Sequence, residues 1–397
     1  MVSQLCLAAL LMFPGAGDPN AALQEINQWR TDQINQARSS GKTLDAAALN
    51  KGVKDKATAA TDGVKPGEIK PEEGMAWMQL FFMAEKYEDI KALCDRYMTS
   101  NPDENGMFNA ESYCMQSYYR LGKMEDGAMT VSMMKPTNVS QANMMMSYAA
   151  NVFAPAIAEK QGADEAVKLL DGVLAKMPAA TNDNDSKIVA SILASYYGTK
   201  SEILIDAGRK DEGMAALDAG LADTRIPDAN KRALTFTKTR MGLVGNAPPA
   251  IASERGYGSY TSLEALKGKV VVIDFFAHWC PPCKAAFPDM REMYDALKPK
   301  GLEIIGVTKY YGYYNQEKGL SKDDEFARMK GFNDDFKINW PVIYDAGNGE
   351  AFTAYGVSGI PTSVLIDRKG LVRSVHVGYS KESYAAFRKE VEKAISE

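Results

Sequence analysis

Two cysteines separated by two prolines are the residues of this chain best suited to chemistry. Cys280 and Cys283 enclose Pro281-Pro282, and the apolar run 270–273, typical of a buried strand, ends seven residues before the first of them. We expect a helix to begin at this motif, where unpaired N–H groups and a partial positive charge stabilise a thiolate and lower its pKa. Proline is tolerated in a first helical turn, where the N–H needs no partner. These two thiols are therefore suited to forming and breaking a disulfide with each other.

A zinc site and a purely structural disulfide are the competing interpretations of the motif. Zinc needs four ligands, usually from a second CxxC or a histidine pair. The chain has two histidines and no second CxxC, and His278 could complete only part of a site. A short structural disulfide is the simpler alternative. The residues around the motif favour a redox pair, for which we expect no metal and no cofactor.

The segments that must position the cysteines alternate between strand and helix patterns. A turn signal, Asp367-Arg368-Lys369-Gly370, separates two apolar runs and predicts a hairpin. A strand–helix–strand unit followed by this hairpin and a last helix predicts a mixed sheet flanked by helices, an α/β domain. The predicted strands are 270–276, 302–307, 363–366 and 372–377, and the predicted helices are 284–297 and 381–396.

From Leu243 to Glu397 the chain resembles the thioredoxin superfamily, and within it the exported TlpA-like thiol-disulfide reductases. The resemblance implies a thioredoxin-like fold for residues 242–397. The Gly and Pro content of Gly242 to Pro249 predicts the boundary to the preceding domain. The landmarks that carry it, in chain order, are Gly245-Asn246-Ala247-Pro248, the segment Leu263 to Lys269, Trp279 with the CPPC motif, Pro288, Ile360-Pro361-Thr362 and Gly378.

The same resemblance implies roles for three residues. Cys280, at the helix end and closer to solvent, is the attacking thiolate, and Cys283 is the resolving thiol that releases the mixed disulfide. Asp274, six residues before Cys280, matches the buried acid that helps to move the proton of the resolving cysteine. An ordinary polar residue at a strand end is the alternative for Asp274. The chain departs from many thioredoxins at Gly306, where they have a lysine, and Lys309 lies three residues further on.

Substrate binding is assigned by resemblance to Trp279, Ile360 and Pro361. A cis bond before Pro361 would hold the Ile360 backbone beside the attacking cysteine, where an extended substrate segment can pair with it. Trp279 would cover the disulfide and present an apolar surface. We interpret His376 as a satisfied strand residue, and we expect the tyrosine-rich loop 310–314, with the insertion up to residue 340, to pack near the edge of the active site.

The remaining composition is consistent with an exported protein of two domains. The chain has 397 residues, 46% of them hydrophobic, and a net charge of −5 with both signs interspersed, which does not favour nucleic-acid binding. Met1 to Phe13 is almost entirely apolar and is followed by Gly15-Ala16-Gly17, so residues 1–17 are predicted to be a signal peptide, although they lack a basic start. A buried helix is the alternative. Export predicts a periplasmic or cell-envelope location.

Residues 18–241 have helical patterns throughout and a degenerate repeat. Short polar turns followed by amphipathic helices recur around Glu88, Glu125, Asp164 and Asp211, at spacings of 37, 39 and 47 residues. Tetratricopeptide repeats have 34 residues, so this is a diverged, tetratricopeptide-like helical array or an irregular helical domain. A stacked array would leave a concave face able to hold a peptide or protein. The polar segment 41–71 is expected to be a mobile connector.

Two further cysteines, Cys94 and Cys114, remain once the signal segment with Cys6 is set aside. They fall on successive predicted helices and could form a second disulfide or a pair of buried free thiols.

The function that these features favour is reduction of disulfides in partner proteins. Pro281-Pro282 removes two N–H groups beside the attacking thiolate, which predicts a more reducing couple. The expected partners are protein thiols and disulfides, a membrane electron donor, and a peptide or protein held by the helices. A disulfide isomerase or oxidase, or an interaction protein whose helical array binds envelope partners, is the alternative.

Overall fold

The computed structural model describes residues 17–397 apart from residues 42 and 101. The predicted signal peptide, 1–17, therefore lies outside the described residues except for Gly17. The described chain forms two compact units, one ending at Ala207 and the other beginning at Gly208. The boundary expected at residues 241–242 stays a prediction. No helix in the described ranges is long and apolar enough to cross a membrane.

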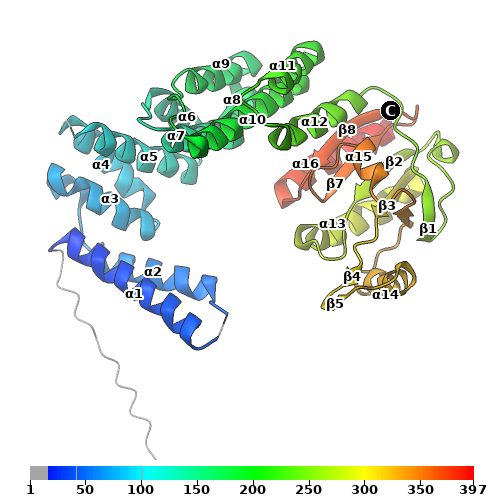
Figure 1. Ribbon diagram of the computed structural model, residues 1–397, viewed down its shortest axis with the longest axis horizontal. Coiled ribbons are helices and arrows are strands. Elements are labelled where there is room, and N and C mark those ends of the chain that lie inside the picture. The colour runs from blue at the N-terminus through cyan, green and yellow to red at the C-terminus, as the bar shows by residue number, and fades with distance from the viewer. Residues whose placement is uncertain (1–16, 42, 101) are drawn as a thin grey trace, which may run out of the picture. The chain divides into compact units, whose positions relative to one another are not determined.

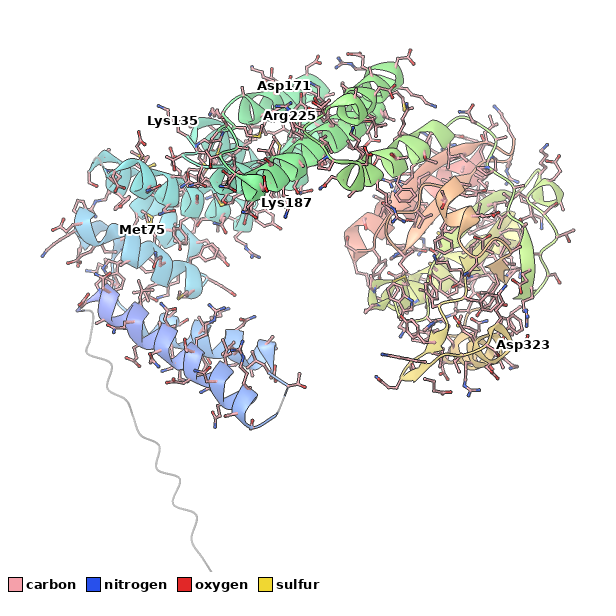
Figure 2. The ribbon with its side chains drawn as sticks, in the orientation of Figure 1. Met75, Lys135, Asp171, Lys187, Arg225 and Asp323 are labelled. Carbon is pink, nitrogen blue, oxygen red and sulfur yellow. A yellow bond between two sulfur atoms is a disulfide. The ribbon has the colours of Figure 1, made fainter. Side chains whose placement is uncertain are left out.

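The first unit is all helical, as the sequence predicts (Figure 1). Helices that are neighbours in sequence pack against one another and bury two apolar clusters. Asp171 of α9 (labelled in Figure 2) accepts hydrogen bonds from two residues of α10, Tyr196 at 2.5 Å and Lys200 at 2.8 Å. The helices are α1 (Pro19–Ser39), α2 (Ala46–Ala60), α3 (Gly74–Met83), α4 (Tyr87–Thr99), α5 (Glu104–Arg120), α6 (Met124–Met133), α7 (Val139–Tyr148), the π-helix η3 (Ala149–Phe153), α8 (Ala154–Gln161), α9 (Ala163–Leu174) and α10 (Asp183–Asp206), with short 3-10 turns at Pro66–Glu68 and Pro71–Glu73.

The expectation of a connector at residues 41–71 is wrong, because α2 lies within this segment. Asp45 caps the helix by accepting hydrogen bonds from the N–H groups of Ala47 and Ala48, both at 3.0 Å. Leu49 is buried, and Gly52 lies so close to Trp29 of α1 that a side chain there would collide with the indole. Alanine-rich composition and one apolar contact face are enough to fold a segment that is otherwise polar.

All four predicted polar turns begin helices, at α4, α6, α9 and, in the second unit, α11 (Lys210–Ala222). Two of these turns have the same hydrogen-bond pattern: Lys86 N–H donates to Phe81 O and Lys123 N–H donates to Tyr118 O, each at 2.8 Å. The preceding residues, Glu85 and Gly122, both have positive φ, 58° and 71°. The repeat thus has a geometric basis in its turns, while its relation to tetratricopeptide repeats stays a prediction.

Cys94 of α4 and Cys114 of α5 form a disulfide, which decides between the two alternatives for these cysteines. Both side chains are buried in the cluster that α3, α4 and α5 share. The bond closes a loop between positions 20 residues apart. It therefore ties together two helices that already pack on each other.

Removing this bond should destabilise the first unit. For a loop of this length the loss of chain entropy in the unfolded state is worth about 3 kcal/mol, so Cys94→Ala/Cys114→Ala is expected to lower the free energy of unfolding by about that amount. Urea unfolding followed by far-UV circular dichroism measures it. The control repeats the comparison in a reductant strong enough to open both disulfides, where variant and wild type should be equally stable. Equal stability of variant and wild type without reductant would show that the bond adds nothing to the packing.

The second unit is a six-stranded mixed sheet with helices on both faces, as predicted. Its strand order is β1-β6-β3-β2-β7-β8, with β2, β3 and β6 parallel and the others antiparallel to their neighbours. Strands β1 and β6 were not predicted. The elements are α11 (Lys210–Ala222), α12 (Asp228–Leu243), β1 (Ser253–Tyr257), β2 (Val270–Phe275), α13 (Pro281–Leu297), β3 (Leu302–Thr308), the two-residue strands β4 (Tyr313–Tyr314) and β5 (Glu317–Lys318), α14 (Lys322–Asp335), β6 (Val342–Asp345), α15 (Glu350–Ala354), β7 (Thr362–Ile366), β8 (Val372–Val377) and α16 (Lys381–Ser396).

Alternation along β2 divides the core of this unit between two faces. Val270 and Val272 belong to the cluster formed with α13, α14 and α16, whereas Val271 and Ile273 belong to the cluster formed with α15 and the end of α12. Every residue of β2 is buried, as expected of a central strand. By the same alternation, Asp274 faces the α13 side of the sheet.

Helix α12 is bound to the sheet domain by a buried arginine. The Arg240 guanidinium donates to the Gly356 carbonyl at 2.9 Å and to the Ser358 hydroxyl at 3.0 Å. Gly356 has φ +64°, and a side chain there would collide with the backbone carbonyl of Phe236. This close approach fixes the segment that leads into the Ile360–Pro361 loop.

Candidate active site

The two cysteines lie where the sequence predicts them, between the end of β2 and the start of α13. Cys280 is the N-cap of α13, and the N–H of Cys283 donates to its Sγ at 3.2 Å. Because Pro281 and Pro282 occupy the first two helical positions, Cys283 supplies the first N–H of the helix. The two sulfurs form a disulfide, with Cys280 2% and Cys283 0% exposed. The expected difference in solvent access is small in this oxidised state.

Asp274 is buried inside the same unit, with 1% of its surface exposed. The Ser363 hydroxyl donates to its Oδ1 at 3.1 Å, and its Oδ2 has no hydrogen-bond partner among the described residues. Burial raises the pKa of Asp274 to about 7, although the hydrogen bond from Ser363 acts in the opposite direction. A carboxyl group with this pKa can gain and lose a proton near neutral pH.

The position of the absent lysine is filled by aromatic residues. Gly306 is the register partner of Asp274 on β3, and a side chain there would meet Phe276 and the indole nitrogen of Trp340. Lys309 lies elsewhere, with its Nζ 5.3 Å from the centre of the Phe352 ring. The acid therefore has no lysine at this register position.

The loop at Pro361 reaches the disulfide. The Ile360–Pro361 bond is cis, as the resemblance predicts, and the Ile360 carbonyl oxygen lies 3.7 Å from Cys280 Sγ. The N–H of Gly378, where φ is +87°, donates to the Pro361 carbonyl at 2.7 Å and so ties the loop to the end of β8. The structure thus brings Ile360 and Pro361 together with the cysteine motif.

Two exposed apolar side chains lie near the disulfide and the cis-proline loop. Trp279 is 42% exposed, and Val377 at the end of β8, next to the cis-proline loop, is 49% exposed. Val377 pairs with Thr362 and lies near Gly359, so strand register places it there. The sequence prediction missed Val377 because nothing in its local pattern separates it from an ordinary strand end.

The tyrosine-rich loop packs beside the motif, as expected. Tyr311 contacts Trp279 edge to face, with ring centres 5.5 Å apart. The ring centre of His278 lies 5.2 Å from that of Tyr313 and 5.1 Å from that of Tyr314. The insertion therefore forms an aromatic wall on one side of the CPPC motif.

Two buried titratable groups behind this wall were not assigned a role from the sequence. Glu325 on α14, 1% exposed, accepts N–H bonds from Tyr311, at 2.9 and 3.1 Å, and from Gly312, at 2.8 Å. His278 Nε2 lies 4.0 Å from the Glu325 carboxylate. Burial, followed by the charge of Lys284, lowers the pKa of His278 to about 4, so the imidazole is neutral at pH 7. His376, in contrast, is hydrogen-bonded to Glu390 at 3.1 Å, as a satisfied strand residue would be.

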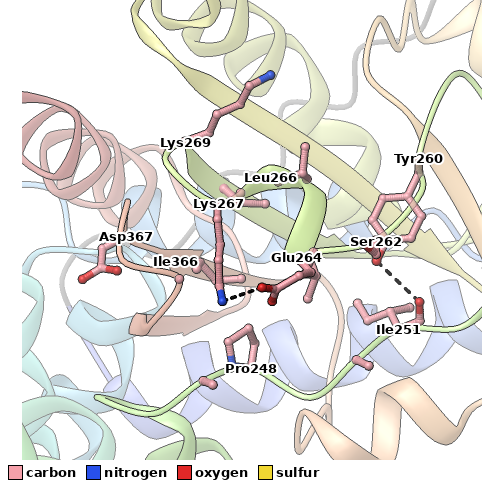
Figure 3. Close-up of a pocket in the computed structure, with 15 residues that line it drawn as sticks. Pro248, Ile251, Tyr260, Ser262, Glu264, Leu266, Lys267, Lys269, Ile366 and Asp367 are labelled. Atoms are coloured by element: carbon pink, nitrogen blue, oxygen red, sulfur yellow. Dashed lines mark hydrogen bonds and ion pairs between the residues drawn. The ribbon is translucent and has the colours of Figure 1, made fainter.

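A cavity of about 210 Å³ lies at the other end of β2 (Figure 3). Its lining includes Val271, Ile366 and Pro248, and the Lys267–Glu264 ion pair, at 2.6 Å, borders it. Since Val271 is near the start of β2 and the CPPC motif follows its end, this cavity is separate from the disulfide. In the described part of the chain, no group of three or more His, Cys, Asp and Glu side chains is arranged to hold a metal ion.

The sheet domain is similar in sequence to known proteins. A family model described as Redoxin matches residues 243–395. The thiol-disulfide oxidoreductase ResA of Bacillus thuringiensis subsp. konkukian is 31% identical over 157 residues, which are 39% of this chain and 83% of that protein. The chain belongs to the redoxin family. ResA of Bacillus subtilis (strain 168) is 34% identical over 139 residues, 35% of this chain and 70% of that protein.

The redoxin match has a clear extent. It begins at residue 243 and contains the whole sheet, the CPPC motif and Asp274, so it does not reach the preceding helices. A crystal structure of a putative thiol:disulfide interchange protein DsbE from Chlorobium tepidum aligns with 38% of this chain and 97% of that chain, at 30% identity and a TM-score of 0.33. The redoxin domain is a thiol-disulfide oxidoreductase with the CXXC pair Cys280–Cys283.

The raised pKa of Asp274 predicts how stability depends on pH. Its carboxyl titrates at 3.8 in the unfolded chain and at about 7 in the folded one. Between these values the folded state binds more protons, so stability falls as pH rises. Asp274→Asn removes this titration. At pH 8 the variant is expected to be more stable than wild type by up to about 4 kcal/mol, and this gain should vanish at pH 4.

Urea unfolding of the oxidised protein at both pH values, followed by a probe in the redoxin domain, measures this difference. Asp323→Asn, at an exposed carboxylate that pairs with Arg255 on the surface (labelled in Figure 2), is the control and should lack the gain at pH 8, because exposed ion pairs contribute little. A gain for Asp274→Asn that is equal at pH 4 and pH 8 would contradict the assignment.

Proposed function

We propose that this redoxin is an exported protein-disulfide reductase, in which Cys280 attacks and Cys283 resolves. The observation that carries the proposal is that the junction of β2 and α13 has three features. A CPPC disulfide lies at a helix N-terminus, a buried carboxyl with a pKa near 7 lies in the strand before it, and the Ile360 carbonyl is 3.7 Å from Cys280 Sγ.

The reaction begins from the reduced protein. The Cys280 thiolate attacks a substrate disulfide, forming a mixed disulfide and releasing one substrate sulfur as a thiolate. Cys283 then loses its proton to Asp274, and its sulfur attacks Cys280 Sγ. The Cys280–Cys283 bond forms, the mixed disulfide breaks and the second substrate thiolate leaves. The substrate gains two electrons, the dithiol is oxidised, and solvent supplies the protons that the product thiols take up.

Substrate would bind across the cis-proline loop. An extended segment can pair with the Ile360 backbone, while Trp279 and Val377 offer apolar contacts on either side. Both side chains are unusually exposed for their size. This arrangement suits a polypeptide disulfide.

The motif supports the reducing direction. A thiolate stabilised by many N–H groups favours the reduced protein and makes the couple oxidising. Here Pro281 and Pro282 withhold two donors, and the Cys283 N–H is the contact given to Cys280 Sγ. A disulfide isomerase or oxidase is the alternative.

Export is supported by two disulfides in one chain, because such bonds persist in oxidising compartments. With the apolar N-terminus, they favour the periplasm or cell envelope. There a reductase needs a membrane electron donor to restore its dithiol. The helices of residues 18–241 would hold a peptide or protein partner, and residues 242–397 would carry the chemistry. If the helices bind partners but the protein does not reduce their disulfides, the chain is instead an interaction protein.

The reduction potential of the Cys280–Cys283 pair tests the direction. We expect a value near or below about −250 mV after equilibration of the mature protein in graded thiol–disulfide buffers. A value near about −120 mV would identify an oxidant and reverse the proposed direction. Cys280→Ser should abolish turnover, and retained partner binding would separate the enzyme from an interaction protein. Unchanged turnover would contradict the role of Cys280.

The aromatic wall should matter for protein substrates more than for small ones. An edge-to-face contact is worth about 1 kcal/mol, so Tyr311→Ala is expected to lower kcat/KM for a protein disulfide about fivefold. Tyr313→Ala should act in the same direction. Turnover of a small disulfide and the reduction potential should stay at wild-type values.

Tyr311→Phe keeps the ring beside Trp279 and is the matched control, expected to behave as wild type. Glu325→Gln replaces two acceptor oxygens by one acceptor and one donor, so it should disturb the N–H bonds to Tyr311 and Gly312 and resemble Tyr311→Ala. If Tyr311→Ala leaves turnover of the protein substrate unchanged, the wall takes no part in binding.

A further inference from the structure

A row of residues crosses the sheet at the level of Asp274. The strand registers pair Gly306 with Asp274, Asp274 with Ser363, and Ser363 with His376. Directly paired residues present their side chains on the same face of a sheet. Ser363 therefore lies beside the buried acid, 89 residues away in sequence.

Among the groups near Asp274, Ser363 donates a hydrogen bond to it, whereas the others have different partners or no side chain. Gly306 offers no side chain from β3. On α16, burial raises the pKa of Tyr384, and the nearby charge of Asp274 adds to this effect. The Tyr384 hydroxyl donates to Met293 Sδ, at 3.6 Å, rather than to Asp274. From β8, His376 bonds Glu390. The Ser363 hydroxyl alone is seen to bond the carboxyl in the described part of the chain, through Oδ1.

The two oxygens of Asp274 are therefore unequal. Oδ1 is held by Ser363, whereas Oδ2 is buried and has no partner among the described residues. A buried carboxyl oxygen without a partner is costly when it is charged and much less so when it carries a proton. With Oδ1 already hydrogen-bonded to Ser363, Oδ2 is the oxygen that gains more from carrying a proton.

We infer that Ser363 is a positioning residue for the resolving step, holding Oδ1 of Asp274 so that Oδ2 accepts the proton of Cys283. This inference rests on the proposed role of Asp274 as the acid–base group. The Cys283 S–H bond breaks as the Oδ2–H bond forms, and the sulfur electron pair forms the bond to Cys280. The substrate sulfur leaves with the electrons of the mixed disulfide. Solvent later removes the proton from Oδ2.

Loss of the hydroxyl should change the pH dependence of this step. A hydrogen bond to a carboxylate favours its charged form, so Ser363→Ala removes the contact that opposes burial. The pH at half-maximal resolution rate should rise by about one unit, with the rate about tenfold lower on the acid side. Ser363→Thr retains a hydroxyl and should restore the wild-type profile.

The experiment uses the reduced full chain and the small disulfide 5,5′-dithiobis(2-nitrobenzoate). Its first coloured thiolate reports attack by Cys280, and its second reports resolution by Cys283, so stopped-flow absorbance separates the two steps. Ser363→Ala should leave the first release unchanged and shift the pH profile of the second. An unshifted second release, or no rescue by Ser363→Thr, would overturn the inference.

Asp274→Asn separates the failure of this inference from that of the proposed function. If Asp274→Asn keeps the wild-type profile, the proposed role of Asp274 fails. If Asp274→Asn abolishes the titration while Ser363→Ala does not move it, only the positioning role fails. Ser363→Ala should add nothing in the Asp274→Asn background. His376→Gln, in the same row but bonded to Glu390, should leave the profile in place, and a shift equal to that of Ser363→Ala would contradict positioning by the hydroxyl.

Discussion

Keeping one carboxyl group dry in the central strand is the constraint on which the redoxin domain depends. Asp274 occupies a position that strand alternation assigns to the core, so its neighbours must exclude water without supplying a countercharge. Phe276 and Trp340 close the space over Gly306, and α13 and α16 cover the same face. A lysine at residue 306 would stabilise the charged form of Asp274 and lower the pKa of its carboxyl group. Its absence leaves a group that exchanges its proton near neutral pH.

The cysteine pair is positioned by the same strand. Only residues 276–280 separate the end of β2 from the start of α13. The sulfur of Cys280, the N-cap of α13, therefore lies at the edge of the sheet, where the cis-proline loop that precedes β7 approaches it. The antiparallel pairing of β7 with both β2 and β8 then decides what surrounds the disulfide. It brings Ser363 beside the acid and Val377 beside the opening. One sheet register thus places both the proposed acid–base pair and the proposed substrate contact.

This division explains what the sequence could and could not predict. Cys280, Cys283, Asp274 and Pro361 lie in short patterns that can be read locally. The structure joins the two cysteines in a disulfide beside the cis-proline loop and buries Asp274 in the preceding strand. Ser363, Val377 and Glu325 act through pairings between distant segments, so no window around them distinguishes them from ordinary residues. Strand β6 was missed because its three apolar residues lie between a proline and an aspartate and resemble a short loop. In the helical unit, turns with a fixed hydrogen-bond pattern were recognisable, whereas α2 was masked by its polar composition.

The buried Arg240 has a consequence for where the redoxin domain could be cut. The family model begins to match at residue 243, three residues after this arginine, yet the Arg240 guanidinium donates to a carbonyl in the segment that precedes the cis-proline loop. A fragment that began at residue 243 would keep the sheet and both cysteines but lose the donor to that carbonyl. The structural unit around the cysteine motif is therefore longer than the segment that the family model matches, because α12 packs on it through Arg240.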